Sequence, residues 1–271
     1  MERPIGIFDS GIGGVTVLKE IIRMLPQEDI IYFGDIARSP YGSKSESLVV
    51  KYSNQALSFL LSQNVKLVVI ACNTVSSVAM ESLSQRFPYI IGVIEPAVSE
   101  AIKLGETIGV IGTRRTIASS IYQKKIARQG KKVIAKACPL FVSLVEEGWV
   151  DNKITKKITK AICEEYLSEL KGKIDVLILG CTHYPFLLQT IKETIGDDVY
   201  IVSSSSATAI ATKALLEKKG LFNTKGGKIR FYISDEPGDF MLKAADFLDI
   251  SITDIQRIDL EEYESSISRK V

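Results

Sequence analysis

The sequence predicts an α/β protein made of two similar doubly wound parallel-sheet domains that face each other across a cleft. Three observations predict this class. Short apolar runs recur along the chain with helix-like segments between them, as in parallel sheets covered by helices. Polar residues follow most runs directly, as expected at the carboxyl edge of open α/β sheets. Two of the runs end in similar cysteine-containing segments, about a hundred residues apart.

Nine runs of aliphatic and β-branched residues are expected to be buried parallel strands. In chain order they are 5–8, 30–33, 65–71, 90–94, 107–111, 133–137, 176–179, 199–202 and 229–233. The apolar periodicity from Val15 to Leu25 predicts a helix. Pro96 ends a strand pattern, and a serine run covers 203–206. We therefore predict one domain of residues 1–96 and 207–271 and a second of 97–206.

A weak internal repeat accompanies this layout. The segment from Ile5 to Gly11 resembles the segment from Ile108 to Thr113, just as the two cysteine segments resemble each other. Two similar half-domains facing each other would explain both matches. Chance similarity among strands rich in Ile, Val and Gly explains them equally well.

Composition excludes several classes of protein. The chain has 271 residues, 46% of them hydrophobic, and a net charge of only +2 without a basic stripe, so nucleic acid is not an expected partner. It has four cysteines without a Cys-x-x-Cys pair and one histidine, so we expect no metal site. A signal-peptide pattern and a long apolar span are both absent from the sequence, so we expect no membrane association and a reducing cytoplasmic location.

Cys72 and Cys181 are the most informative residues. Each ends an apolar run and precedes small polar residues, at a strand-to-helix junction where aligned N–H groups can lower a thiol pKa. Free cysteines are often buried packing residues, which would explain either one alone. The pair in the same setting favours a site with a sulfur on each of two opposing walls, suited to a reaction on both faces of one atom. Cys138 and Cys163 are interpreted as structural.

Other candidates each have a structural alternative. The turn of Asp9, Ser10 and the glycines after them could approach a ligand, or simply cap a helix. His183 could hold a proton beside Cys181. Glu146 and Glu147 could supply its carboxylate partner, or lie in solvent. Tyr41 and Gly42 belong to a tight turn and become functional only if they face the cleft. One of Thr113 and Thr116 is explained by helix capping.

Taken together, these segments resemble the glutamate racemases, cofactor-independent enzymes that interconvert L- and D-glutamate for bacterial cell-wall synthesis. The resemblance spans nearly the whole chain. The markers are Ile7-Phe8-Asp9-Ser10-Gly11-Ile12-Gly13-Gly14, Asp35 with Pro40-Tyr41-Gly42, Ala71-Cys72-Asn73-Thr74, Thr113 with Thr116, Glu146-Glu147-Gly148, and Leu179-Gly180-Cys181-Thr182-His183-Tyr184-Pro185.

The resemblance implies roles for particular residues. Cys72 and Cys181 would be the acid/base thiols on the two faces of the substrate α-carbon. Asp9 would assist Cys72, and His183, oriented by Glu147, would assist Cys181. The implied substrate-binding residues are Asp9, Ser10, Tyr41, Gly42, Asn73, Thr74, Thr113, Thr116, Thr182 and His183. One departure is the run Ser203 to Ser206, where many members carry an acidic residue, so a bridging role for that carboxylate is in doubt here.

The resemblance also implies a homodimer and glutamate as the small-molecule substrate. Since no lysine sits in a convincing cofactor pocket, we expect no pyridoxal phosphate, and the protein itself must stabilise the carbanion. Three alternatives stay open: an aspartate or broad-specificity racemase of the same superfamily, a cysteine hydrolase using Cys181 and His183, and a non-catalytic amino-acid binding protein.

Overall fold

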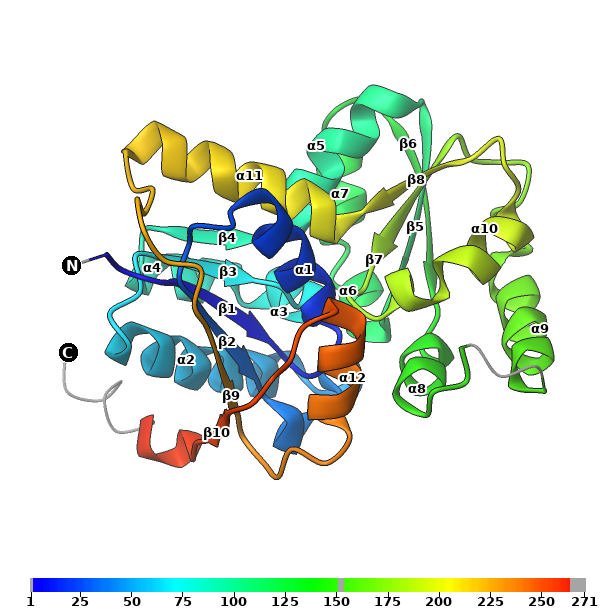
Figure 1. The fold of residues 1–271 in the computed structure, drawn as a ribbon. Coiled ribbons are helices and arrows are strands. Elements are labelled where there is room, and N and C mark those ends of the chain that lie inside the picture. Colours follow the sequence, from blue (N-terminus) through cyan, green and yellow to red (C-terminus); the bar gives the residue numbers. More distant parts are fainter. Residues whose placement is uncertain (1, 151–153, 264–271) are drawn as a thin grey trace.

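The computed structural model describes residues 2–150 and 154–263, which contain two parallel β-sheets flanked by helices (Figure 1). The first sheet has six strands in the order β10-β9-β2-β1-β3-β4. Its strands are β1 (Ile5–Asp9), β2 (Ile30–Gly34), β3 (Leu67–Ile70), β4 (Ile90–Gly92), β9 (Ile229–Ile233) and β10 (Ile255–Arg257). Every pairing in it is parallel.

The second sheet has four strands in the order β6-β5-β7-β8, also paired in parallel. They are β5 (Thr107–Gly112), β6 (Lys132–Ala137), β7 (Val176–Gly180) and β8 (Tyr200–Ser203). The prediction of two parallel-sheet α/β domains is confirmed. The order β6-β5-β7-β8 repeats the order β2-β1-β3-β4 of the first sheet, which favours an internal repeat over chance similarity.

Each of the nine predicted runs overlaps a strand, with ends that differ by a few residues, and β10 was not predicted. The strand β10 offers one apolar residue, Ile255, beside the polar Gln256 and Arg257, and it pairs only with β9 at the edge of the sheet. The limits predicted for the two domains remain a proposal. The first sheet does take its strands from both sides of the second sheet in the sequence, as that division expects.

Helices cover both faces of the first sheet (Figure 1). On one face α1 (Val15–Met24), α11 (Ser204–Lys219) and α12 (Phe240–Leu248) pack on the side chains of Ile5 and Ile7. On the other face α2 (Glu46–Ser62), α3 (Asn73–Val78) and α4 (Met80–Arg86) pack around Phe8. Alternate residues of β1 therefore serve the two faces, which is why this strand reads as a continuous apolar run.

The second sheet is also covered on both sides. Its helices are α5 (Ile94–Leu104), α6 (Arg114–Ala118), α7 (Ile121–Ala127), α8 (Leu140–Glu146), α9 (Thr155–Leu167) and α10 (Leu188–Ile195). One hydrophobic core joins Ile108 and Val176 of this sheet to Ile5 of the first sheet, with Ala97 of α5 and Ala209 of α11 between them. In Figure 1 α11, coloured yellow, runs from the end of β8 across the first sheet. The two halves therefore share buried apolar surface.

Short 3₁₀ segments complete the described chain: Ile36–Arg38, Tyr41–Ser43, Tyr184–Leu187 and Leu260–Tyr263. Within the described residues, no helix has the length and apolar character needed to cross a membrane.

Candidate functional site

The two cysteines lie at equivalent places in the two sheets. Cys72 follows β3 and Cys181 follows β7, and each of these strands pairs with the first strand of its half, β1 or β5. In both sheets the strand order reverses at this pair, and ligands of open α/β sheets bind at such points. Both side chains are 5% exposed. The fold therefore places both thiols at the kind of edge where a reaction site is expected.

Cys72 occupies the residue position directly before α3. Its Sγ lies 3.5 Å from the Oγ of Ser10, which follows β1. Burial raises the pKa of this thiol to about 12, and the nearby charges of Asp9 and Cys181 contribute in the same direction. The contribution from Cys181 means that its sulfur is close enough to affect the pKa of Cys72.

Asp9 is a fully buried carboxyl at the end of β1. It accepts a hydrogen bond from the N–H of Gly11 at 3.0 Å and another from the hydroxyl of Thr182 at 3.4 Å. Burial raises the pKa of Asp9 to about 6, against the opposing effects of the His183 charge and these hydrogen bonds. Asp9 is therefore poised to exchange a proton near neutral pH, and it is bonded to a residue of the other half.

The second thiol has a different partner. The Sγ of Cys181 lies 3.8 Å from Nδ1 of His183, and Nε2 of the same ring lies 3.2 Å from Oε1 of Glu146. Burial by itself would lower the pKa of His183, but the bonds to Cys181 and Glu146 outweigh it and raise the pKa to about 10. The imidazole is therefore held in its charged form beside the thiol at neutral pH.

The carboxylate that orients His183 is not the one that the resemblance implies. Glu146, the last residue of α8, makes the contact, whereas Glu147 is exposed. Glu146 also accepts a weak bond from Ser39, and its backbone oxygen accepts from Lys243 at 2.6 Å. The implied role of Glu147 is therefore corrected to Glu146. Two adjacent glutamates look alike in sequence, and the turn of α8 decides which of them points at the ring.

Three predicted threonines form one buried cluster across the two halves. The hydroxyl of Thr74 on α3 lies 2.9 Å from that of Thr113 and 3.5 Å from that of Thr116. Thr113 follows β5 and caps α6, where its side chain accepts from the N–H of Thr116. The cluster therefore joins the segment after Cys72 to the corresponding segment of the second sheet.

Tyr41 and Gly42 also lie at this junction. The hydroxyl of Tyr41 donates to the buried carboxylate of Asp35, which is bonded in addition to Arg38 and Ser234. A Cβ on Gly42 would lie 2.6 Å from the Cβ of Thr113. Only glycine allows this turn to approach the second half so closely, which favours the functional interpretation of the turn over the purely structural one.

Asn73, the remaining predicted residue, has partners that sequence reasoning missed. Its side chain is bonded to the hydroxyls of Tyr122 on α7 and Ser204 on α11. Ser204 belongs to the serine run noted as a departure, and its neighbour Ser205 bonds to Thr16 on α1 at 2.9 Å. A lone tyrosine in an amphipathic helix carries no sequence signal of function, whereas the serine run did mark its own position.

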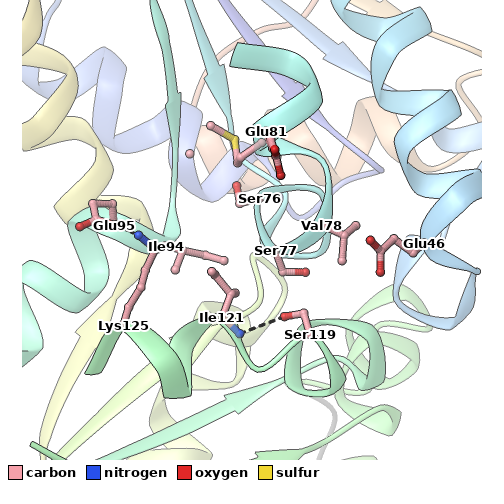
Figure 2. Close-up of a pocket in the computed structure, with 12 residues that line it drawn as sticks. Glu46, Ser76, Ser77, Val78, Glu81, Ile94, Glu95, Ser119, Ile121 and Lys125 are labelled. Atoms are coloured by element: carbon pink, nitrogen blue, oxygen red, sulfur yellow. Dashed lines mark hydrogen bonds and ion pairs between the residues drawn. The ribbon is translucent and has the colours of Figure 1, made fainter. Parts of the chain in front are cut away.

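A separate cavity of about 470 Å³ contains neither thiol. Figure 2 shows it between α3 and α4 on one side and the start of α7 on the other, with Glu46, Glu81 and Glu95 around it. Glu95 is ion-paired with Lys125. Since the cavity lacks an acid/base pair of the kind found at the cysteines, we do not place the reaction there. In residues 2–150 and 154–263, no cluster of three or more His, Cys, Asp or Glu could hold a metal ion.

Comparison with known proteins matches this arrangement to a family. Residues 5–212 match the family model described as Asp/Glu/Hydantoin racemase. The chain is 45% identical to a glutamate racemase of Geobacter metallireducens over 267 residues, covering 96% of this chain and 97% of that one. It is 47% identical to a glutamate racemase of Aquifex aeolicus over 234 residues, covering 85% and 88%.

Solved structures agree. A glutamate racemase of Francisella tularensis, determined in complex with D-glutamate, superposes with a TM-score of 0.90 at 39% identity and covers 97% of this chain and 99% of that chain. The match therefore extends over nearly the whole of both chains. The chain therefore belongs to the aspartate/glutamate/hydantoin racemase family.

Proposed function

We propose that this protein interconverts L- and D-glutamate by a two-thiol acid/base mechanism without pyridoxal phosphate, and so supplies D-glutamate for peptidoglycan synthesis. The observation that carries the proposal is the pair of buried cysteines at equivalent strand ends, with the Asp9 carboxyl close enough to Cys72 to affect its pKa and His183 bonded to Cys181. The glutamate racemases among the relatives support the choice of substrate.

In the proposed reaction one sulfur removes the α-proton while the other donates one. From D-glutamate, the Cys72 thiolate takes the proton as the C–H bond breaks, and the Cys181 thiol gives its proton to the opposite face. The product is L-glutamate, and the thiolate now lies on Cys181. The reverse reaction uses the same atoms in opposite roles, so each turnover exchanges one substrate proton for one enzyme proton.

Asp9 and His183 have complementary tasks in this scheme. A thiol with a pKa of about 12 is rarely ionised at pH 7, but Asp9, with a pKa of about 6, is a nearby carboxylate that can receive its proton. The α-ammonium group of the amino acid adds a positive charge that favours the thiolate. On the other wall, charged His183 can return a proton to the sulfur of Cys181.

The carbanion formed between the sulfurs must be stabilised, and fixed groups of the protein can do this better than mobile water molecules. We propose that the hydroxyls of Thr74, Thr113 and Thr116 and nearby backbone N–H groups hold the substrate carboxylate, with Ser10, Tyr41, Gly42, Asn73 and Thr182 completing the pocket. Such groups are fixed before the reaction, so the developing charge meets dipoles that need no rearrangement.

We also propose a cytoplasmic location, where thiols stay reduced, and a homodimer, which light scattering would test.

The deciding experiment is exchange of the α-proton in heavy water. Either enantiomer, incubated without added pyridoxal phosphate, should yield the opposite enantiomer carrying deuterium. Cys72→Ala and Cys181→Ala should each reduce racemisation by roughly 10³-fold or more. Cys163→Ala, which removes a buried thiol of the second half, is the matched control and should retain turnover.

The outcomes separate the alternatives. Full turnover by Cys72→Ala would refute the two-thiol scheme. A panel including aspartate and other amino acids tests the broader racemase, and an acyl-enzyme on Cys181 in mass spectra would indicate a hydrolase. Binding without exchange of the α-proton would leave a binding protein.

A further inference from the structure

Both polar atoms of the Asn73 carboxamide are hydrogen-bonded to residues of later helices. Asn73 directly follows Cys72 and is 2% exposed. Its amide oxygen accepts from the hydroxyl of Tyr122 at 2.7 Å, and its Nδ2 lies 3.3 Å from Oγ of Ser204. Since a carboxamide can be placed in two flipped orientations, its orientation must follow from what these partners can donate and accept.

The hydroxyl of Ser204 decides the orientation. It lies 3.3 Å from the backbone oxygen of Leu179, which can only accept, so the single hydroxyl proton of Ser204 is used there. Toward Asn73 the serine oxygen can then only accept, which places Nδ2 of Asn73 on that side. The amide oxygen consequently faces Tyr122. A flipped amide would compel Ser204 to abandon the buried oxygen of Leu179.

Tyr122 is suited to donate at all working pH values. It lies on α7 and is fully buried. Burial and the nearby charge of Cys181 raise its pKa well above the ordinary value, so the phenol keeps its proton. The bonds thus run in one direction, from Tyr122 to Asn73, from Asn73 to Ser204, and from Ser204 to Leu179, two residues before Cys181.

We propose that Tyr122 and Ser204 are positioning residues that fix the amide of Asn73 in one orientation, so that its second N–H meets the amino acid between the thiols. The inference rests on the proposed racemisation and adds two residues to its site. It also explains what the serine run does here: Ser204 connects the residue after one thiol to the strand that carries the other.

Kinetics of three variants test the proposal. Tyr122→Phe and Ser204→Ala should each raise KM about tenfold for both enantiomers, with a smaller change in kcat. Ser206→Ala, two residues further along the same helix, should leave both kcat and KM unchanged. Tyr184→Phe removes an equally buried hydroxyl, whose partner is the backbone oxygen of Cys138, and serves as the stability control. Thermal unfolding of all four variants separates positioning from general destabilisation.

A spectroscopic measurement tests the orientation without turnover. In protein labelled with ¹⁵N-asparagine, the side-chain signals of Asn73 are assigned by their absence in Asn73→Asp. They should be sharp and slow to exchange with solvent in the unaltered protein, and broadened or fast in Tyr122→Phe and Ser204→Ala. Kinetic constants within twofold of the unaltered protein in both variants, or unchanged Asn73 signals in both, would overturn the inference. Absence of racemisation by the unaltered protein would instead overturn the proposed function, and the signals would still decide the orientation.

Discussion

At the scale of residues, the two thiols are equivalent in position but unlike in chemistry. Cys72 is accompanied by a hydroxyl and a buried carboxyl, whereas Cys181 is accompanied by an imidazole bound to a carboxylate. Enantiomers have equal free energies, so kcat/KM must be the same in both directions. The separate values of kcat and KM can nevertheless differ, because the bound enantiomers meet different groups.

The two shifted pKa values predict a bell-shaped dependence of kcat/KM on pH. Activity should rise as Asp9 ionises near pH 6, since the proposed mechanism needs the carboxylate to receive a proton. It should fall as His183 loses its proton near pH 10. In Glu146→Gln the alkaline limb should move to lower pH, because one of the groups that raise the pKa of His183 is gone.

Glu147→Gln is the matched control for that shift, since Glu147 is the exposed neighbour. Its profile should superimpose on that of the unaltered protein. Steady-state rates between pH 5 and 11 provide the measurement. A shift in Glu147→Gln with none in Glu146→Gln would restore the role that the family resemblance implies.

The buried carboxylate of Asp9 is expected to serve the reaction while it destabilises the folded protein at neutral and alkaline pH. Its pKa is about 6 in the folded protein against an ordinary 3.8, so the folded state favours the protonated carboxyl. Stability from this group is therefore present below pH 3.8 and lost as the pH rises through 6. Asp9→Asn should abolish racemisation yet raise the free energy of unfolding at pH 8 by on the order of 1–3 kcal/mol.

Denaturant unfolding of both proteins at several pH values checks this prediction. The difference between them should shrink as the pH falls below 4. A less stable Asp9→Asn at pH 8 would show that the hydrogen bonds of the carboxylate to Gly11 and Thr182 outweigh the cost of burying its charge.

Residue patterns predicted which groups lie at the strand ends but not which of them would touch. Cys72, Cys181, Asp9 and His183 could be placed at strand ends from the apolar runs that precede them. Glu146, Tyr122 and Ser204 could not. The contact of Glu146 with His183 depends on the turn of α8, and the contacts of Tyr122 and Ser204 with Asn73 depend on how helices of one half meet the other. Sequence periodicity describes each helix separately and contains no information about how helices of the two halves pack together.

At the scale of elements, the turn at Tyr41–Ser43 fits closely against α6. The Nε of Arg115 donates to the backbone oxygen of Lys44 at 3.0 Å, beside the contact of Gly42 with Thr113. In Gly42→Ala the new methyl would lie 2.6 Å from Cβ of Thr113, so the turn and α6 must separate. We expect kcat/KM to fall by about 10- to 100-fold with little loss of thermal stability.

Gly34→Ala is the control for Gly42→Ala. Gly34 also lies at the carboxyl edge of the first sheet, but its added methyl would meet the nearest atom at an ordinary 3.4 Å. Racemisation and thermal unfolding should be nearly unchanged. Equal losses in the two variants would mean that any added methyl at this edge is harmful, and that the contact with Thr113 has no special part.

The elements themselves were largely predictable because buried parallel strands are uniformly apolar and leave a strong pattern. The serine run was less informative. It suggested a domain boundary, which stays a proposal, and it did not reveal that Ser203 caps the long helix α11, which begins at Ser204. A cap and a linker use the same small polar residues, so the composition alone could not distinguish them.

At the scale of the whole molecule, the two halves are joined around the site by hydroxyl contacts, and both candidate thiols are 5% exposed. From this burial we expect substrate to reach them when the halves separate. We therefore expect iodoacetamide to modify Cys72 and Cys181 at least several times faster than Cys138 and Cys163, which are 0% exposed and do not lie where the halves meet. Modification of Cys138 and Cys163 requires local unfolding instead.

Saturating glutamate should slow the modification of Cys72 and Cys181 and leave Cys138 and Cys163 unaffected. Peptide mass spectrometry of timed samples measures all four rates. Equal rates at the four cysteines would indicate that the molecule opens only by unfolding, and not by separation of its halves.

Because both sulfurs are buried, the protonation state left by one turnover persists for some time after the product is released. In the proposed mechanism, a molecule that has just released L-glutamate carries its negative charge on Cys181, and one that has released D-glutamate carries it on Cys72. Asp9 and His183 must then restore the first form before the same enantiomer can be processed again, and we expect them to exchange their own protons with bulk water while the halves are apart. At very high concentrations of one enantiomer, this resetting step would then limit the rate, and the progress curve would reveal how long the molecule stays open.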